Sequence, residues 1–543
     1  MKQYQADVIV VGAGLAGIVT AIELLNAGKS VVMLDRDEER EIGGLAKWSF
    51  GGMFFVNTPI QRRGGIRDSV DLALSDWLST AQFAPEDELP RQWAEQYVHL
   101  CTDQVYRWLR EQHRIRFFPV VHWVERGLLR PGNSCPRFHM VWGTGKALTD
   151  NLITSLHSHP KYAERVQLLF RHKVTDLVVA GDRVGGVRGL VEPGEIPFEA
   201  TADHIVVATG GIGGSIEKVK QHWYKPWGSP PQRILNGAHK YGLGDLHDAV
   251  ARIDGHITHL DWQWNYAAGV HHPQPKWDNH GLSLIPPKSA LWLNFRGERI
   301  GPPPLITAYD TRWLVEEICK QEKKYSWQVL NYKIMMKEFA ISGSEHNTAM
   351  RDKKLLAFVK TILFGNRQLV DEMLQSEDFV TAGSLEELVE KMNALEGTDD
   401  VQLDAVRDAV TRYDAQIDRG PKFHNDEQLR RIAHARRYRG DRVRTCKFQK
   451  IVDQKAMPLV AIREFILSRK SLGGIQTDLS CRVMSRPVDW RQEPIPGLYA
   501  VGEAAGFGGG GMHGKGALEG TFLGGCVLTG RIAARTICGQ IIA

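Results

Sequence analysis

A set of glycines and one aspartate near the N-terminus has the spacing of a dinucleotide-binding site. The set is Gly12, Gly14, Gly17 and Asp35. The glycines follow the apolar run 8–11, and the aspartate ends the apolar run 31–34. Glycine permits a tight turn and a close approach of the backbone to a pyrophosphate, and a carboxylate can accept hydrogen bonds from ribose hydroxyls. We therefore expect a strand, a glycine turn, a helix and a second strand.

A second group of glycines distinguishes between two dinucleotide cofactors. Gly43-Gly44 follows the aspartate, and Ser49 and Gly51-Gly52 come next. A dinucleotide that extends to a flavin needs this second approach of the backbone, which NAD domains usually lack. The pattern therefore indicates FAD rather than NAD.

Three more motifs follow in order: "HKVTDLVV" at 172–179, "ADHIVVATGG" at 202–211 and "IPGLYAVGEAAG" at 495–506. With the N-terminal motif, they resemble the flavoprotein family of fumarate reductases, succinate dehydrogenases and 3-ketosteroid dehydrogenases. The ketosteroid dehydrogenase branch is the most similar. Some members attach the flavin covalently through a His near Ser49. Residues 40–60 contain no His, so the resemblance implies noncovalent FAD.

The resemblance implies contacts with each part of FAD. The backbone near Val174 would meet the adenine, and Glu503 would bind the ribityl hydroxyls. Gly43, Gly44 and Ser49 would contact the diphosphate, the ribityl chain or the flavin. The complete set of expected FAD-binding residues is Gly12, Ala13, Gly14, Leu15, Ala16, Gly17, Asp35, Arg36, Gly43, Gly44, Leu45, Ser49, Gly51, Gly52, Val174, Ala208, Thr209, Gly210, Gly502, Glu503, Thr521, Phe522 and Leu523.

The glycine-rich segment "GFGGGGMHGKGALEG" at 506–520 is expected to carry catalytic groups. In the ketosteroid dehydrogenases that the chain resembles, a backbone N–H and a Tyr hydroxyl in this stretch polarise the substrate ketone. Gly516 matches the backbone donor. Met512 stands at the position of the Tyr, so His513 or Lys515 would have to replace that hydroxyl, or the substrate is not a ketosteroid.

The reaction that the resemblance implies is desaturation of a small apolar carbonyl compound. A base takes the proton α to the carbonyl, and flavin N5 takes a hydride from the β carbon. The base of the ketosteroid branch is a Tyr that follows a VNxxGxRF-like stretch, which "LWLNFRGERIGPPP" at 291–304 resembles. Tyr309 is the nearest candidate, and Tyr325 is the reserve. With no second GxGxxG unit and no iron–sulfur motif, the electrons would pass to a quinone, a carrier or oxygen.

Two alternative functions stay open. Fumarate reductases place a His before a TxGG stretch and an Arg in an HGxNRLGG stretch, whereas this chain has Lys470 and Ala517 at these positions. A reductase of an unsaturated acid is therefore disfavoured. The other alternative is a flavin-binding subunit of a redox complex without turnover. The absence of the Tyr favours this non-catalytic alternative, whereas the large middle region favours an enzyme.

The cofactor motifs lie at both ends of the chain and predict an α/β fold. We expect a Rossmann-like FAD-binding domain of the GR2 type, assembled from the discontinuous segments 1–250 and 453–543. Residues 251–452 would form an inserted α+β cap with a catalytic role. The active site would then lie between the two domains, where ligand sites often occur. Helices are expected over 70–115 and over most of 311–418.

Bulk composition indicates an ordinary globular protein. The 543 residues are 43% hydrophobic and 24% charged, with a net charge of +5. The seven cysteines form neither CxxC nor CxxCH, so we expect reduced thiols and no metal site. No signal peptide and no run of about 18 apolar residues is visible, which predicts a cytoplasmic protein without a membrane span. The oligomeric state is left open.

Two further motifs suggest functions that we do not expect. Residues 509–515 match GxxxxGK, but Gly516 stands where a P-loop needs Ser or Thr, so ATP binding is not expected. The basic stretch 429–447 could bind nucleic acid. We expect it to be a solvated face of the cap or a subunit contact instead, with no nucleic-acid partner.

Overall fold

The apolar run at the N-terminus forms strand β2 (Val8–Val11), whose four residues are all buried in a mostly parallel sheet. The computed structural model describes residues 1–118, 120–489 and 491–540. The strand order of this Rossmann sheet is β21-β22-β10-β2-β3-β6, and only β21 runs antiparallel to its neighbour. Its other strands are β3 (Val31–Leu34), β6 (Val166–Leu169), β10 (His204–Val207), β21 (Arg482–Met484) and β22 (Pro494–Ala500).

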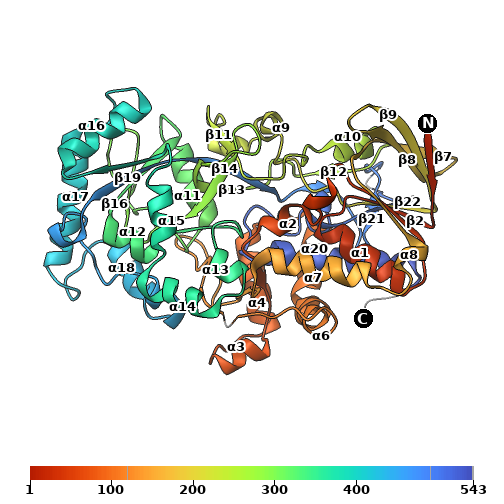
Figure 1. Ribbon diagram of the computed structural model, residues 1–543, viewed down its shortest axis with the longest axis horizontal. Coiled ribbons are helices and arrows are strands. Elements are labelled where there is room, and N and C mark those ends of the chain that lie inside the picture. The colour runs from red at the N-terminus through yellow and green to blue at the C-terminus, as the bar shows by residue number, and fades with distance from the viewer. Residues whose placement is uncertain (119, 490, 541–543) are drawn as a thin grey trace.

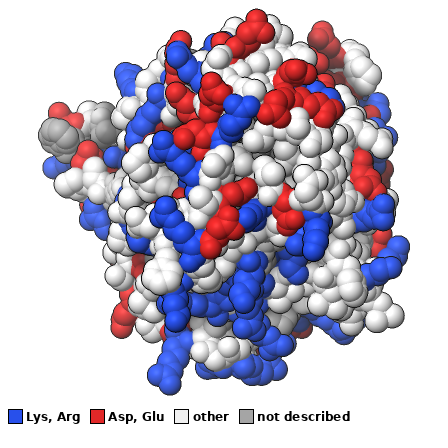
Figure 2. Space-filling model, turned by 90° about the vertical axis from the view of Figure 1, so that its left-hand side faces the viewer, with Lys and Arg blue, Asp and Glu red and all other residues white. Residues whose placement is uncertain are grey.

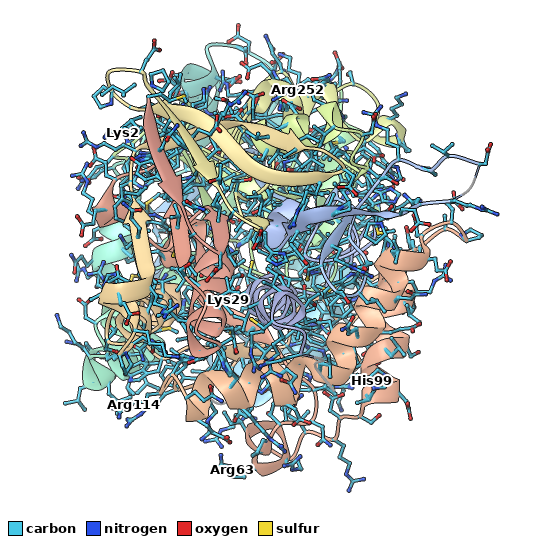
Figure 3. The ribbon with its side chains drawn as sticks, turned by 90° about the vertical axis from the view of Figure 1, so that its right-hand side faces the viewer. Lys2, Lys29, Arg63, His99, Arg114 and Arg252 are labelled. Carbon is cyan, nitrogen blue, oxygen red and sulfur yellow. The ribbon has the colours of Figure 1, made fainter. Side chains whose placement is uncertain are left out.

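Strands that are distant in sequence are neighbours in the Rossmann sheet. Val206 of β10 pairs with Val10 on one side and with Tyr499 on the other. A second sheet in this half has the order β1-β9-β8-β7. Figure 3 shows its edge at Lys2, with Arg63 and His99 on the helices at the opposite side of the molecule. The strands of this second sheet are β1 (Lys2–Gln5), β7 (His172–Ala180), β8 (Arg183–Val191) and β9 (Ile196–Thr201).

Two helices from opposite ends of the chain lie against each other beside the Rossmann sheet (Figure 1). They are α1 (Leu15–Asn26) and α20 (Thr521–Ile537). A Cβ atom at Gly530 would lie 2.7 Å from the carbonyl oxygen of Ala16, so the missing side chain allows this close approach. The other helices of this half are α2 (Gly44–Trp48), α3 (Pro59–Arg63), α4 (Val70–Ala81), α5 (Glu88–Leu100), α6 (Trp108–Glu111), α7 (Thr144–His157), α8 (Tyr162–Arg165), α9 (Ile216–Gln221) and α10 (Asp245–Arg252).

A long strand, β19 (Leu459–Ser471), is the centre of the second large sheet, which we call the cap sheet. The cap sheet has the order β15-β16-β19-β13-β14-β17, and β11 and β18 also pair with β19. Its other strands are β11 (Ile234–Asn236), β13 (Gln263–His271), β14 (Gly281–Ile285), β15 (Leu291–Leu293), β16 (Tyr325–Asn331), β17 (Ala340–Ile341) and β18 (Phe379–Ala382). Two short pairs complete the strands: β4 (Gly52–Phe54) with β5 (Phe138–Met140), and β12 (Ile257–Thr258) with β20 (Gly474–Ile475).

Helices surround the cap sheet and form the left-hand end of the molecule in Figure 1. On the face of this end shown in Figure 2, Lys and Arg side chains gather on the lower part. The helices are α11 (Thr311–Cys319), α12 (Tyr332–Glu338), α13 (Thr348–Arg351), α14 (Leu355–Phe364), α15 (Arg367–Met373), α16 (Leu385–Glu396), α17 (Leu403–Asp418), α18 (Glu427–Ala435) and α19 (Arg439–Val443). No helix among the described residues is both long enough and apolar enough to cross a bilayer.

Strand β19 connects the two halves of the molecule. It pairs with β13 and β16 in the cap sheet, and its last residues reach the cavity described below. The division of the chain at 250/251 and 452/453 assigns β11 and β19 to the Rossmann half, although both strands lie in the cap sheet. We therefore propose that residues 1–250 and 453–543 form the FAD-binding half and residues 251–452 the cap half. The strands β11 and β19 belong to the first half by sequence but pair in the cap sheet, so the two halves share them.

Candidate cofactor and active site

A cavity of about 260 Å³ lies at the carboxyl ends of β2, β3 and β10 and extends to β13 and β19 of the cap sheet. Ligands of open α/β sheets bind at this edge, where the strands end and loops begin. The cavity is therefore placed where the glycine motifs predict the cofactor.

The N-terminus of α1 fits a phosphate group. Its N-cap is Gly14, which has no side chain to accept bonds from the first-turn amides, and Leu15 and Ala16 line the cavity beside it. A Cβ atom at Gly14 would meet no atom within 4 Å and would project into the cavity. Gly12 has φ +108°, and a Cβ there would lie 2.4 Å from the carbonyl oxygen of Ala208, so the turn needs glycine. Unpaired amides at a helix N-terminus suit a pyrophosphate.

One end of the cavity fits the adenosine part of a dinucleotide. Asp35 lies there at the end of β3, and its carboxylate accepts a hydrogen bond of 2.6 Å from the backbone N–H of Ala13. The guanidinium of Arg36 lies 4.5 Å from the ring centre of Tyr241, and both residues line the wall with Val174. An oriented carboxylate beside a flat, partly aromatic surface can bind ribose hydroxyls and a base.

A half-buried carboxylate lies between the two sheets. Glu503 lines the cavity, and its Oε1 accepts a hydrogen bond of 2.8 Å from the backbone N–H of Ser471. Burial raises the pKa of Glu503. A carboxyl group at this place can bind sugar-alcohol hydroxyls, so the donors and acceptors along the cavity fit the chemistry of FAD from adenosine to ribityl chain.

Most of the predicted FAD-binding residues line the cavity. They are Gly12, Gly14, Leu15, Ala16, Asp35, Arg36, Gly43, Gly44, Leu45, Ser49, Gly51, Gly52, Val174, Ala208, Thr209, Gly210, Glu503, Phe522 and Leu523.

Four predicted FAD-binding residues lie behind the cavity wall and hold it in place. Ala13 orients Asp35, and a Cβ at Gly17 would lie 2.0 Å from the carbonyl oxygen of Gly12, so Gly17 serves the packing of α1 on β2. The backbone N–H of Gly502 donates to Thr529 at 2.9 Å. The hydroxyl of Thr521 donates to the carbonyl oxygen of Leu518 at 2.7 Å.

The opposite end of the cavity contains a hydrogen-bonded cluster of polar side chains, three of which are titratable. We call Trp264, Tyr266, Lys470 and Glu519 the Lys470 cluster. The Nζ of Lys470 donates to the hydroxyl of Tyr266 at 3.0 Å, and this hydroxyl donates to Glu519 at 2.5 Å. The indole N–H of Trp264 donates to the same carboxylate oxygen at 2.8 Å. Lys470, Tyr266 and Glu519 all line the cavity, so a polar chain ends in an ammonium group that faces it.

The surroundings of the Lys470 cluster shift two of its pKa values. Lys470 faces the cavity but is otherwise enclosed by protein, and this burial lowers its pKa to about 8, although the charge of Glu519 acts in the opposite direction. Burial and Glu519 raise the pKa of Tyr266 well above its ordinary value. Lys470 is therefore the group whose proton can be exchanged near neutral pH.

Two aromatic rings separate His513 from the cavity. Phe507 and Phe522 line the wall, and the ring centre of His513 lies 4.8 Å from that of Phe522 and 5.6 Å from that of Trp77. Neither ring nitrogen of His513 has a hydrogen-bond partner among the described residues. Burial, together with the charge of Lys470, lowers the pKa of His513 to about 3. The predicted catalytic histidine is thus a neutral side chain of the core and does not face the cavity.

Gly516 and Tyr309 also lie away from the cavity. Both line a separate pocket of about 10 Å³. Tyr309 is buried in the core, and its hydroxyl donates to the carbonyl oxygen of Arg431 at 2.6 Å. The reserve candidate Tyr325 is buried in β16, beside Phe465. The structure therefore does not bring the predicted tyrosines or the Gly516 amide to the walls of the cofactor cavity.

The glycines of the 506–520 segment allow close packing against two helices. A Cβ at Gly508 would lie 2.5 Å from the ring of Trp93 in α5, and a Cβ at Gly514 would lie 2.2 Å from the carbonyl oxygen of Ala81 in α4. The N–H of Lys515 donates to that same oxygen at 2.8 Å. The segment is glycine-rich because helices cover it, and this contact draws Gly516 away from the cavity.

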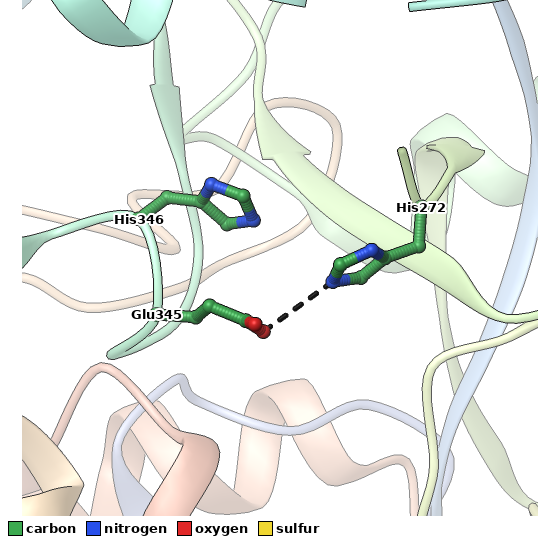
Figure 4. A group of neighbouring side chains, drawn as sticks. All are labelled: His272, Glu345 and His346. Atoms are coloured by element: carbon green, nitrogen blue, oxygen red, sulfur yellow. Dashed lines mark hydrogen bonds and ion pairs between the residues drawn. The ribbon is translucent and has the colours of Figure 1, made fainter. Parts of the chain in front are cut away.

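A second group of titratable side chains, His272, Glu345 and His346, lies beside the cap sheet (Figure 4). Their ligand atoms all lie within 4.8 Å of one another, as in a metal site. However, the Nδ1 of His272 accepts a hydrogen bond of 2.9 Å from the backbone N–H of Gln274, which places its proton on Nε2. This Nε2 lies 3.3 Å from Glu345 and donates to it, so the pair is satisfied by a hydrogen bond rather than by an ion.

A family model described as an FAD binding domain matches residues 7–523. The chain therefore belongs to this family of FAD-binding flavoproteins. A KsdD-like steroid dehydrogenase of Mycobacterium tuberculosis is 43% identical over 553 residues, which cover 98% of this chain and 95% of that protein. A KsdD-like steroid dehydrogenase of Mycolicibacterium smegmatis is 42% identical over 539 residues, which cover 95% of this chain and 96% of that protein.

Solved structures have the same fold. The 3-ketosteroid Δ1-dehydrogenase from Sterolibacterium denitrificans, in complex with 1,4-androstadiene-3,17-dione, is similar with a TM-score of 0.72 and 16% identity, over 99% of this chain and 100% of that one. The open conformation of a flavocytochrome c3 fumarate reductase has a TM-score of 0.66 and 19% identity, over 99% of this chain and 78% of that one. The predicted fold, the FAD cofactor and the class of FAD-dependent oxidoreductase are confirmed.

The Lys470 cluster lies outside the predicted catalytic set. Lys470 takes the position of a fumarate reductase His, and Glu519 lies in the glycine-rich segment. The sequence therefore pointed to both positions as possible parts of the site. Tyr266 carried none, because it is 204 residues from Lys470 in sequence and meets it only through the pairing of β13 with β19.

Proposed function

We propose that the protein removes two hydrogens from adjacent carbons next to the carbonyl group of a steroid. The observation that carries this proposal is the position of Lys470 at one end of the cofactor cavity, between apolar walls that include Phe507 and Phe522. Flat aromatic walls suit a flat apolar substrate, and a proton-exchanging group suits a carbon made acidic by a carbonyl. The names of the relatives that share more than two fifths of the sequence support the same substrate class.

The cavity-lining residues would hold FAD noncovalently, with its adenosine part at Asp35 and Arg36 and its flavin near Phe522. When bound, FAD supplies a two-electron acceptor. An external acceptor, for which a quinone, a protein carrier and oxygen are the candidates, would then take the electrons away.

Lys470 would act as the general base. A lysine with a pKa of about 8 has a substantial neutral fraction at slightly alkaline pH, and its Nζ can then take the proton from the carbon next to the carbonyl. Tyr266 is a poor base because its pKa is raised well above 10, so it positions Nζ through their hydrogen bond. Glu519 in turn holds Tyr266 and stabilises the ammonium that forms.

The test is anaerobic single-turnover mixing of the FAD-loaded protein with 3-ketosteroids whose first ring is saturated or holds one double bond. We expect bleaching of the oxidised flavin band and a product lighter by two hydrogens. The role of Lys470 is tested with the FAD-loaded Lys470→Met protein, in which the flavin should bleach at least about 100-fold more slowly than in the unaltered protein. Absence of bleaching with every ketosteroid would contradict the proposal. Rapid reoxidation of the reduced protein by fumarate would assign it to the reductases instead.

A further inference from the structure

Helix α14 exposes an unusual amount of apolar side chain. Its sequence is LLAFVKTILF, and none of its residues is buried. Leu356 is 87% exposed and Phe364 is 73% exposed. The other exposed large apolar residues of the helix are Leu355, Val359 and Leu363. A contiguous apolar surface of this kind on a folded protein marks a place where something else docks.

The helix is held to the protein along one narrow side. Phe358 packs against Phe118, with ring centres 5.2 Å apart, and against Trp142 at 5.7 Å. A guanidinium N–H of Arg444 reaches the carbonyl oxygen of Thr361 at 3.4 Å. The exposed apolar residues recur at positions 355, 356, 359 and 363, which is the spacing of one helix face. The helix is thus anchored by Phe358 and presents a continuous apolar stripe outward.

Basic side chains surround the apolar stripe. The exposed ones in and beside α14 are Lys353, Lys354, Lys360 and Arg367. Arg444 connects α14 to the basic stretch 429–447, whose exposed Arg437, Arg439, Arg442 and Lys447 add further charge. Part of this charge is paired within the protein: Asp352 contacts Arg351 at 2.7 Å and Lys354 at 3.8 Å, and Asp371 contacts Arg367 at 3.4 Å. Among the described residues, Lys353 and Lys360 form no salt bridge. In Figure 1, α14 lies at the lower edge of the cap, and in Figure 2, Lys and Arg gather on the lower part of that end.

We propose that α14 docks the protein on an anionic membrane surface. Its apolar stripe would enter the boundary between headgroups and acyl chains, and the surrounding Lys and Arg side chains would contact anionic headgroups. A second copy of the chain fits this surface poorly, because a two-fold contact would bring two basic rims together. Arg430 and Arg431 of the basic stretch pair with Glu427, whereas Arg437, Arg439, Arg442 and Lys447 form no salt bridge among the described residues and would be free to meet such headgroups.

Vesicle co-sedimentation tests the proposal with the full FAD-loaded chain. Phosphatidylcholine vesicles are compared with vesicles that contain about 30% phosphatidylglycerol. We expect at least about tenfold tighter binding to the anionic vesicles, and a loss of this preference in high salt. The double variant Leu356→Asp/Leu363→Asp, with both substitutions in the stripe, should bind at least about tenfold more weakly. The matched control is Phe423→Asp, at a cap residue that is 69% exposed but lies outside α14, and it should bind as the unaltered protein does.

Two results would overturn the proposal. One is equal binding of the double variant and the unaltered protein to anionic vesicles, or no binding by either. The other is a dimer in light scattering that the double variant lacks, since a second copy would then cover α14. The substituted side chains are exposed, so an unchanged flavin spectrum and melting temperature should accompany the loss of vesicle binding. This test does not involve the ketosteroid reaction and stands whether or not that reaction is found.

Discussion

At the Nζ of Lys470, two influences on the pKa oppose each other. Enclosure by protein disfavours the ammonium, whereas the negative charge of Glu519 favours it. Enclosure has the larger effect, so the pKa falls from 10.5 to about 8. The same enclosure lowers the pKa of His513 to about 3 and leaves that imidazole neutral. Of these two basic groups, only Lys470 both faces the cavity and titrates near the pH of the cell.

The first prediction at this scale concerns the pH dependence of turnover. Because the neutral amine is the base, the rate of flavin reduction by substrate should rise with pH, with its midpoint near the Lys470 pKa of about 8, and level off about one pH unit higher. Replacing Glu519 by Gln removes the charge that favours the ammonium, so the midpoint of the rise should move to lower pH. Single-turnover rates measured from pH 6 to about 10 check both expectations.

Two variants, one at Lys470 and one at His513, serve as controls for this prediction. Lys470→Arg keeps a positive charge but cannot lose its proton, so it should abolish the rise. His513→Gln should leave the midpoint in place, because that ring does not face the cavity. A midpoint that is unchanged in the Glu519→Gln protein would exclude Lys470 as the titrating group.

At the scale of elements, the sequence predicted the part of the cofactor site that is formed by elements consecutive in the chain. β2, the turn at Gly12, α1 and β3 follow one another within a short segment, so spacing alone identifies them. The Lys470 cluster could not be found in this way. It is assembled from β13, β19 and the loop before α20, and its geometry depends on strand pairing and on the burial of Lys470. Tyr309 and Gly516 have the expected types and spacing, but packing directs them into other parts of the core.

The second prediction concerns the N-terminus of α1. Replacing Gly14 by Val would place a side chain in the cavity without a clash against protein, so the fold should persist while FAD binding is lost. We expect the dissociation constant of FAD to rise at least about tenfold, measured by titration of deflavinated protein. The matched control is Gly185→Val in β8, which also adds a side chain with no close contact but lies outside the cavity. Equal FAD affinity in the two variants would contradict the assigned phosphate site.

At the scale of the whole molecule, the cavity joins segments that have no covalent reason to stay together. Its walls come from the N-terminal segment with Gly14, from the residues 208–211 that follow β10, and from Glu503 near the C-terminus. The Rossmann half and the cap half have separate apolar cores, and β19 runs from one to the other. A ligand that contacts all of these walls binds the folded chain and not the unfolded one.

The third prediction follows from this linkage. Free FAD at about 100 times its dissociation constant should stabilise the folded protein by about 2.7 kcal/mol, so the melting temperature should rise with FAD concentration. The Gly14→Val protein should melt near the temperature of the deflavinated protein and should not respond to the same FAD concentrations. Differential scanning calorimetry with deflavinated protein measures both. If FAD left the melting temperature of the unaltered protein unchanged, the cavity would not hold the cofactor, because binding confined to the folded state cannot leave the unfolding equilibrium where it was.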